Sequence, residues 1–382
     1  MIFTAPRLVE THRPPSVPRG DARTRKVATL LRDSVAAARA GSLAHVSCDA
    51  PAIRRTRVGR GFAYFLPNGK RLTRDSDLRR IATLAIPPAW RDVRICTKAT
   101  GHLQCTGYDA RGRRQYRYHA RWREVRDEAK YSDILLFAAT LPKLRHAVDR
   151  DLSTAPLTKP KVVATVLRIM ERTSIRVGND RYTEENGSFG LTTLLDRHVH
   201  IGPSTIEFRF RGKGGKARRA EIRDRKLAEV VKRCRDVPGQ RLFQYIDDRG
   251  QRHPITSTDV NEYIQTAMGQ PFTAKEFRTW AATVHATTIL HAFPPCRTRT
   301  ERRARLLRGI DEVAAHLGNT RSICKKSYVH PAVMNAYLEE QLTPLFSECL
   351  ARARARAGLH REECAVLALF AALSRRPARA AA

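Results

Sequence analysis

The hydrophobic pattern of this 382-residue chain changes near residue 120, and no other sequence feature limits the possible folds more strongly. Between about 43 and 118, short apolar runs alternate with glycine turns, which is typical of β-strands. From about 121 onward, apolar residues recur at helical spacing, as Val162, Val166 and Met170 do. Strands followed by helices, without an internal repeat, predict an α+β protein with a small β-rich domain and a larger, mostly α-helical domain.

The pattern predicts four segments along the chain. They are a tail and helix at 1–40, a β-rich domain at 41–119, a helical domain at 120–338 and a helical extension at 339–382. Prolines and charges up to about residue 22 indicate a flexible tail, and Gly41 closes the helix that follows. Two hairpins are expected, one around "PNGK" at 67–70 and one around "GKGG" at 212–215.

The last segment holds the longest apolar run, "CAVLALFAAL" at 364–373. It is too short to span a bilayer, so it predicts a buried or docking helix. The "ARARARAG" stretch before it favours a solvated helix face over a DNA-binding arm. The N-terminus lacks the apolar stretch of a signal peptide, and we expect no contact with a membrane.

The chain is strongly basic, with 71 Lys and Arg residues against 37 Asp and Glu residues and a formal net charge of +34. Such an excess repels itself in a compact protein and favours a polyanionic partner. The basic residues are spread along the whole chain, which predicts a folded protein that wraps nucleic acid. A genome that favours arginine explains part of this excess, but the acidic residues are not raised in parallel.

Several classes of chemistry lack their motifs in this sequence. The eight cysteines form no C-x-x-C pair, so we predict free thiols in a reducing cytosol, with neither a zinc site nor disulfides. A phosphate-binding P-loop, an H-E-x-x-H motif and a G-x-S-x-G elbow are all absent from the 382 residues. The two aspartates of "YIDDRGQ" fit a solvated turn. Chemistry on nucleic acid would therefore need neither a metal nor a nucleotide cofactor.

Cleavage of a phosphodiester without a metal makes specific demands on side chains. A tyrosine can serve as the nucleophile and form a covalent intermediate. Arginine suits the nonbridging phosphate oxygens because its planar guanidinium donates two parallel hydrogen bonds. A lysine can protonate the leaving alkoxide. The sequence should therefore contain Arg, Lys, Arg and Tyr on elements that converge.

Candidates for these roles lie at suitable places. Arg176 follows a predicted helix, Lys213 stands at a hairpin tip, and Arg278 lies early in a helix with Lys275 one turn before it. Asn319 follows the helix-ending Gly318. Taken singly, each has a favoured structural explanation, as a helix cap, a solvated turn residue or a surface charge.

Tyr328 lies nine residues after Asn319, in "LGNTRSICKKSYVHP". A lone tyrosine is most often part of a core or a surface hydrogen-bonding residue. Composition by itself leads only to a basic DNA-binding protein.

Five segments read together resemble the type IB DNA topoisomerases of the poxvirus-like, bacterial branch. They are "GRRQYRYH", "SIRVGNDRYTEENGSFGLTTLLDRHV", "FRFRGKGGK", "TAKEFRTWAATV" and "LGNTRSICKKSYVHP". They occur in the order of the family, and the resemblance covers roughly residues 40 to 335. It implies a catalytic fold like that of tyrosine recombinases, with a small DNA-clamping domain at 41–119 and a catalytic domain at 120–338.

The resemblance also implies roles for individual residues. The catalytic residues of the family match Arg176, Lys213, Arg278, Asn319 and Tyr328. The tyrosine would attack a DNA phosphodiester to give a 3′-phosphotyrosine and a free 5′-hydroxyl. After the free end rotates, the 5′-hydroxyl would attack back and reseal the strand, without ATP, metal or any other cofactor.

One catalytic position departs from the commonest pattern, because many relatives carry His where this sequence has Asn319. A neutral amide can still donate a hydrogen bond to a nonbridging oxygen, although it cannot act as an acid. We therefore expect Lys213 to be the main general acid, with Lys275 as an assisting one.

Further residues match DNA-contacting positions of the family. Gln115, Tyr116 and Tyr118 match a segment of the small domain, and Tyr182 matches a tyrosine that contacts phosphate. Tyr116 and Tyr118 are also two residues apart, so they can simply pack side by side on one face of a strand.

The resemblance implies a monomer that closes around double-stranded DNA in the bacterial cytoplasm, associated with the nucleoid. Lys325 and Lys326, beside Tyr328, would contact the DNA backbone. Most contacts of the protein with DNA would go to phosphates, so its affinity for DNA should fall steeply with salt.

Two alternatives stay open on the sequence. A site-specific tyrosine recombinase or integrase shares the Arg, Lys, Arg and Tyr set, although such proteins usually carry His-x-x-Arg where this chain has Lys275-Glu-Phe-Arg278. A noncatalytic DNA-binding protein with a decayed site is the other, and competent residues at all five positions argue against it.

Overall fold

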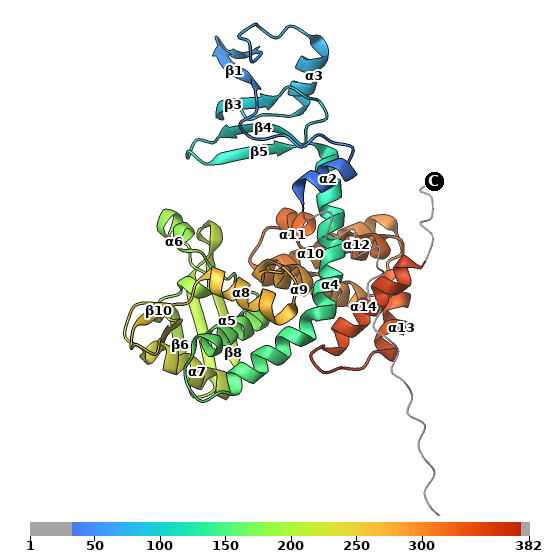
Figure 1. The fold of residues 1–382 in the computed structure, drawn as a ribbon. Helices are drawn as coiled ribbons and strands as arrows, with labels where there is room; N and C mark the ends of the chain where they lie inside the picture. The colour runs from blue at the N-terminus through green and yellow to red at the C-terminus, as the bar shows by residue number, and fades with distance from the viewer. Residues whose placement is uncertain (1–32, 376–382) are drawn as a thin grey trace, which may run out of the picture. The chain divides into compact units, whose positions relative to one another are not determined.

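The computed structural model describes residues 33–375, apart from the side chains of residues 128 and 129. These residues form two compact units that divide between Asp133 and Ile134. The predicted tail lies outside the described residues, as does the first part of the helix expected before Gly41. The long helix α4 (Ala120–Ser153) supplies residues to both units, and its colour marks it in Figure 1.

The first unit is built on one antiparallel sheet, as the sequence pattern predicted. Its elements are α2 (Ser34–Ala40), β1 (Ala52–Val58), β2 (Gly61–Phe65), α3 (Asp75–Thr83), β3 (Arg91–Cys96), β4 (Leu103–Tyr108) and β5 (Arg114–Tyr118). The five strands lie in the order β2-β1-β3-β4-β5. Alternate residues such as Ile53, Val93 and Ile95 bury one face of the sheet, where Ile81 of α3 packs against them.

The hairpin expected around "PNGK" is corrected by the structure. The turn of the hairpin lies at Gly59 and Arg60, because Val58 pairs with Gly61 and β1 is the partner of β2. Gly59 adopts a φ of +57°, which suits a two-residue hairpin turn. The PNGK segment forms a second turn, closed by a hydrogen bond from the Leu66 N–H to the Lys70 carbonyl (2.8 Å), and only a single bridge residue follows it.

The second unit is mostly helical and carries two small antiparallel sheets. Its sheet and 3₁₀ elements are η1 (Leu191–Thr193), η2 (Asp196–His198), β6 (Val199–Ile201), β7 (Thr205–Arg211), η3 (Lys213–Gly215), β8 (Ala217–Arg223), β9 (Gln244–Ile246) and β10 (Arg252–Pro254). After the α4 segment, its helices are α5 (Lys159–Thr173), α6 (Asp180–Asn186), α7 (Arg225–Asp236), α8 (Ser257–Met268), α9 (Ala274–Ala292), α10 (Arg299–Leu317), α11 (Arg321–Ser327), α12 (Pro331–Leu338), α13 (Leu342–Arg352) and α14 (Arg361–Ser374).

Helix α5 lies at the centre of this unit. The sequence predicted one apolar face, but Ala164, Thr165 and Ile169 are as fully buried as Val162 and Val166. Elements pack around the helix on several sides, including the β8 strand and the α7 and α8 helices. Beyond its first two residues, only a strip near the end of the helix, with Arg168, Glu171 and Arg172, stays partly exposed, so the helical period of the sequence understates how much of the helix is covered.

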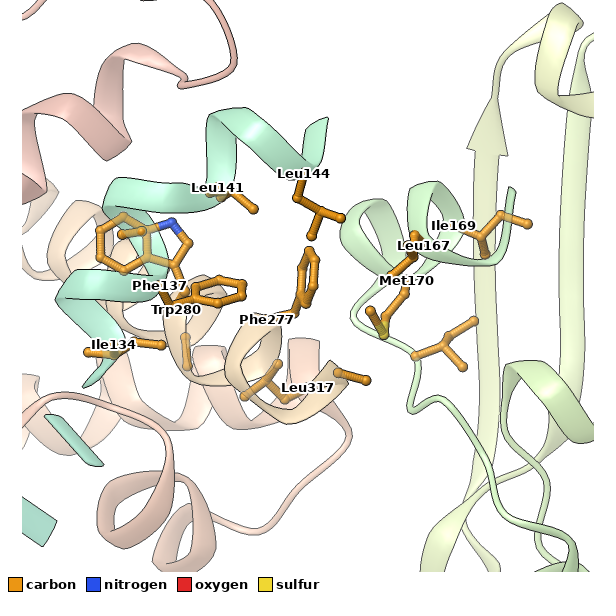
Figure 2. Close-up of a cluster of buried hydrophobic side chains, with 14 of the residues drawn as sticks. Ile134, Phe137, Leu141, Leu144, Leu167, Ile169, Met170, Phe277, Trp280 and Leu317 are labelled. Carbon is orange, nitrogen blue, oxygen red and sulfur yellow. The ribbon is translucent and has the colours of Figure 1, made fainter. Parts of the chain in front are cut away.

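The core continues from α5 to the helices that carry the candidate site. Figure 2 shows Leu167 and Met170 of α5 in one cluster with Phe137 of α4 and with Phe277 of α9. The Phe137 and Phe277 rings meet edge to face, with centroids 5.0 Å apart. Such contacts hold the start of α9 firmly against the core.

The fold class predicted from the sequence is confirmed: a small β-rich unit precedes a larger helical one that contains a β-hairpin. Within residues 33–375, no helix is both long and apolar enough to cross a membrane.

Candidate active site

Arg176 lies in the loop that leaves the central helix α5. Ser174 ends this helix in a left-handed conformation (φ +53°), which turns the chain sharply. The Arg176 carbonyl then accepts a hydrogen bond from the Leu191 N–H (2.9 Å). Close approach of Gly178 and Gly190 permits this pairing, because a Cβ on Gly190 would stand 2.5 Å from the Gly178 Cα.

Asn319 contacts Arg176, although the two residues are 143 positions apart in the chain. It follows Gly318, which closes α10 with a φ of +65°. The Arg176 guanidinium donates a hydrogen bond to the Asn319 side-chain carbonyl. That bond orients the amide, so its Nδ2 is the donor end, and this buried nitrogen has no hydrogen-bond partner among the described residues.

Arg278 is buried, with only 5% of its surface exposed. One guanidinium nitrogen donates to the Ser174 carbonyl and the other to the Leu317 carbonyl (2.8 Å). The side chain thus ties α9 to the ends of α5 and α10. Burial, together with the nearby charge of Arg176, lowers the pKa of Arg278, although a guanidinium stays protonated at neutral pH.

Tyr328 follows the short helix α11, and its N–H donates to the Cys324 carbonyl (3.0 Å). The side chain is half-buried, and its ring centroid lies 5.3 Å from the central guanidinium carbon of Arg278. Tyr328 is therefore held between core packing on one side and a buried cation on the other.

The electrostatics around the phenol favour the phenolate. Burial by itself raises the pKa of Tyr328, but the charge and the hydrogen bond of Arg278 oppose that effect. Arg176 and Lys213 act in the same direction as Arg278, and the pKa ends below its usual value. A lowered pKa is characteristic of an activated nucleophile.

Lys213 stands on the η3 turn between β7 and β8, as the sequence predicted. Its ammonium nitrogen lies 5.1 Å from the centre of the Tyr182 ring on α6. The next two residues, Gly214 and Gly215, both have positive φ values, which shape the turn that presents the lysine.

The predicted side chains of the second unit converge on one open groove, with a cavity volume of about 260 Å³. Its lining includes Arg176, Tyr182, Lys213, Lys275, Arg278 and Tyr328. Asn319 joins this set through its bond with Arg176. A tyrosine facing three cations and an oriented amide can bind an anionic ester and attack it.

Of the remaining predicted DNA contacts, Lys325 and Lys326 lie on α11, and Gln115, Tyr116 and Tyr118 lie on β5 of the first unit. Tyr116 and Tyr118 are 42% and 36% exposed, and their rings stack with centroids 6.2 Å apart. Side-by-side packing and an exposed aromatic surface therefore coexist. Gln115 donates a hydrogen bond to Asp109 (2.9 Å).

Sequence reasoning missed Thr283, which connects α9 to the Tyr328 segment. Its hydroxyl accepts from the His330 N–H (3.3 Å) and lies 3.3 Å from the Tyr328 carbonyl. It also lies 2.8 Å from the Thr279 carbonyl, so either carbonyl can accept its one proton. The spacing of Thr279, Thr283 and Thr287 could have indicated such a contact. Threonine is unfavourable inside a helix, so three on one face suggest that their hydroxyls have specific partners.

Comparison with known proteins agrees with this geometry. A family model of the eukaryotic DNA topoisomerase I catalytic core matches residues 119–345, and one of the bacterial DNA topoisomerase IB N-terminal domain matches residues 61–109. The DNA topoisomerase 1B of Acanthamoeba polyphaga mimivirus is 31% identical over 292 residues, which cover 75% of this chain and 87% of that protein.

Shorter matches are to other DNA topoisomerases. The DNA topoisomerase 1B of vaccinia virus is 25% identical over 116 residues, or 30% of this chain and 37% of the viral one. The DNA topoisomerase 1 of Mycosarcoma maydis is 22% identical over 176 residues, or 41% of this chain and 17% of that protein.

The fold and the matches over most of the second unit define a DNA topoisomerase catalytic core. The chain belongs to the type IB DNA topoisomerase family, an enzyme class of isomerases that act on DNA. The resemblance predicted from the motifs is thereby confirmed.

Proposed function

We propose that Tyr328 is the nucleophile of this topoisomerase and that the groove around it holds the scissile phosphate. The observation that carries the proposal is the convergence of Tyr328 with Arg176, Lys213 and Arg278 on one groove, from four separate parts of the chain. The charges of three cations beside a half-buried phenol are not neutralised within the groove, because no carboxylate lines it, and this favours an anionic ligand.

In the proposed cleavage step, the Tyr328 phenol releases its proton to solvent, and its oxygen attacks phosphorus while the bond to the 5′-oxygen breaks. Lys213 gives its proton to the departing oxygen, which leaves a 5′-hydroxyl and a 3′-phosphotyrosine. Lys275 lines the same groove and can assist as a second acid. The reverse attack by the 5′-hydroxyl, with Lys213 as the base, restores the backbone. Because the ester linkage is preserved throughout, no ATP is consumed.

Charge on the nonbridging oxygens would be met by Arg176, Arg278 and Asn319. Two buried donors support this role, since Arg278 Nε and Asn319 Nδ2 have no hydrogen-bond partner within residues 33–375. Unsatisfied buried donors are costly in a folded protein unless a ligand uses them. Asn319 thus replaces a histidine as an oriented neutral donor.

DNA contacts away from the groove form the second part of the proposal. We assign the β-rich domain at 41–119 to clamping the duplex, with Gln115, Tyr116 and Tyr118 as contacts, and residues 120–338 to catalysis. The exposed, stacked rings of Tyr116 and Tyr118 support this assignment. Tyr182 would contact a phosphate next to Lys213. The expected species is a monomer that binds no nucleotide and acts on the DNA of a bacterial cytoplasm.

The test is relaxation of a supercoiled plasmid by the wild-type protein and by Tyr328→Phe, in EDTA and without ATP. We expect the wild type to relax the plasmid and to be trapped covalently on DNA by detergent. The Phe variant keeps the ring that packs on Arg278 but has no attacking oxygen. It should bind DNA with the same Kd and lose both relaxation and the covalent adduct.

Other outcomes would contradict the proposal in separate ways. An unchanged relaxation rate in Tyr328→Phe would exclude Tyr328 as the nucleophile, and loss of activity in EDTA would indicate a metal requirement. Strict dependence on paired recognition sites would indicate a tyrosine recombinase.

A further inference from the structure

The helices after residue 340 are packed into the core of the catalytic unit, although the sequence suggested no role for them. Phe346 of α13 and Val366 and Leu369 of α14 have no exposed surface. Helix α14 packs against both α13 and α9. The segment from Leu342 to Ser374 is therefore part of the body that carries the groove.

The first link between this segment and the groove is Glu363, a carboxylate with 6% exposed surface. It accepts a hydrogen bond from the Trp280 indole N–H (2.8 Å) and two from the Arg145 guanidinium (2.6 and 3.0 Å). Trp280 lies two residues after Arg278 on α9, within the cluster of Figure 2. The buried carboxylate thus fixes the turn of α9 that bears the catalytic arginine.

The same network extends to the helix that leads to Arg176. Arg145 also pairs with Glu171 (2.5 Å), which lies near the end of α5. Its Nη1 donates in addition to the Gly358 carbonyl (2.8 Å). Gly358 has a φ of +79°, and a Cβ there would lie 2.7 Å from the Cα of Pro142, so the loop before α14 fits closely on α4.

The second link is an aromatic contact behind the nucleophile. The Phe370 ring of α14 lies against the His330 ring, with centroids 4.4 Å apart. His330 is two residues after Tyr328, and its Nδ1 accepts from the Ala332 N–H (3.1 Å) to begin α12. Helix α14 therefore touches the segments on both sides of the site, the one bearing Arg278 and the one bearing Tyr328.

We propose that residues 342–374 are a positioning element of the active site, with Glu363 acting through Arg278 and Phe370 acting through Tyr328. The proposal rests on the catalytic roles assigned above. Small displacements of a reacting group can slow a reaction by up to about a hundredfold, which makes such support relevant to the rate. Glu363 and Phe370 are not catalytic residues, because neither lines the groove.

The first test is the rate of covalent adduct formation by the full chain under single-turnover conditions. The substrate is a duplex whose cleaved strand loses a short 5′-hydroxyl fragment, so that religation cannot occur. Trp280→Phe removes the indole N–H together with part of the buried ring system, and Glu363 keeps its pairing with Arg145. We expect it to slow adduct formation about tenfold while the Kd for the duplex stays unchanged.

A matched control separates positioning from general destabilisation. Val231→Ala removes buried methyl groups from α7, which packs on α5 and the β6–β7 strands instead of on α9. At an equal loss of thermal stability, this control should keep the wild-type adduct rate. An adduct rate that falls equally in both variants would overturn the proposal.

The second test is a double-mutant cycle, in which Trp280→Phe and Phe370→Leu are each combined with Arg278→Ala. The slow formation of the covalent adduct in the Arg278→Ala background is followed over hours. Trp280→Phe should cause no further slowing in the Arg278→Ala background, because its effect passes through Arg278. Phe370→Leu should slow both backgrounds equally, because it acts through Tyr328. Fully additive slowing by Trp280→Phe would overturn the role of Glu363. A wild-type rate in Arg278→Ala itself would instead refute the catalytic assignment on which the inference rests.

Discussion

Single residues in this protein have properties that depend on the neighbours the fold gives them. Thr283 illustrates this, because a hydroxyl inside a helix reaches across to the backbone of the segment that bears Tyr328. It is fully buried, so the bonds it makes are not exchanged for water. The segment that bears Tyr328 is therefore bonded to a residue for which the sequence predicted no role.

Thr283→Val tests the role of the hydroxyl, because valine has nearly the same shape as threonine but cannot form these hydrogen bonds. Loss of the acceptor for the His330 N–H should lower the free energy of unfolding by about 1 kcal/mol and slow adduct formation. Denaturant unfolding and single-turnover cleavage measure the two effects. Thr288→Val is the matched control, because Thr288 is exposed and its hydroxyl bonds only to the Val284 carbonyl of its own helix. Equal behaviour of the two variants would contradict the role of Thr283.

His102 gives the first unit a predictable pH dependence. Burial, and then the charge of the stacked His45, lower its pKa below the usual value of about 6.5. Its Nδ1 accepts from the Val46 N–H (3.0 Å), a bond that protonation of this nitrogen would break. The Trp122 ring packs at 4.5 Å and supplies no opposing charge.

Because the unfolded chain binds this proton more readily, the stabilisation is complete above pH 6.5 and is lost as the pH falls toward the pKa of folded His102. Thermal unfolding between pH 7.5 and 5.5 should therefore show a falling Tm. His102→Asn keeps an acceptor but does not titrate, so its Tm should fall less over the same range. Parallel curves for the two proteins would assign the pH dependence to other groups.

At the scale of elements, the site is assembled where the ends of several helices meet. Helix α9 carries Lys275 and Arg278 and bonds through Arg278 to the end of α5 at Ser174 and the end of α10 at Leu317. The loop after α5 is held by its close contact with Gly190. The geometry of the groove thus depends on how tightly these ends approach one another.

Gly190→Ala tests the close approach. The new methyl would stand within 2.7 Å of the Gly178 backbone and the Arg176 carbonyl, so the loop bearing Arg176 must move. We expect a loss of about 1–3 kcal/mol in the free energy of unfolding and a slower cleavage step. Gly61→Ala is a control, since the nearest atom to its Cβ is 4.0 Å away. Wild-type cleavage in Gly190→Ala would mean that the loop tolerates the displacement.

At the scale of the whole molecule, the net charge of +34 sets the response to salt. Each phosphate that the protein neutralises releases condensed counterions, and affinity falls as their concentration rises. A protein that contacts six or more phosphates should lose about a thousandfold in affinity for duplex DNA between 50 and 200 mM salt. Equilibrium binding across this range measures the slope.

Tyr328→Phe should have the same salt slope as the wild type, because it removes no charge. Lys325→Ala should lower the slope by about 0.9, the value for one phosphate contact, equally on unrelated DNA sequences. A slope that does not change in Lys325→Ala would show that this lysine makes no phosphate contact.

The sequence by itself determined the fold class, several of the helices and, through the resemblance of its motifs to a family, the charged residues and the tyrosines of the groove. Those features follow from local periodicity and from motifs whose residue types match the chemistry. Arg278 was correctly placed early on a helix, and Lys213 on a hairpin turn. The "PNGK" segment forms a turn, but the long hairpin of β1 and β2 turns at Gly59 and Arg60 instead. The sequence could not show this, because a turn signal does not say which strands pair.

Only the tertiary structure decided how buried Arg278 is, that Arg176 orients Asn319, and that Thr283 and Glu363 support the groove. These contacts join residues far apart in the chain, as the Trp280–Glu363 bond joins positions separated by 83 residues. Burial and long-range hydrogen bonds arise only when the whole unit packs, so no local pattern encodes them. The same packing brings Arg278, Arg176 and Lys213 beside Tyr328. Their charges lower its pKa although burial by itself raises it, which changes an ordinary tyrosine into a candidate nucleophile.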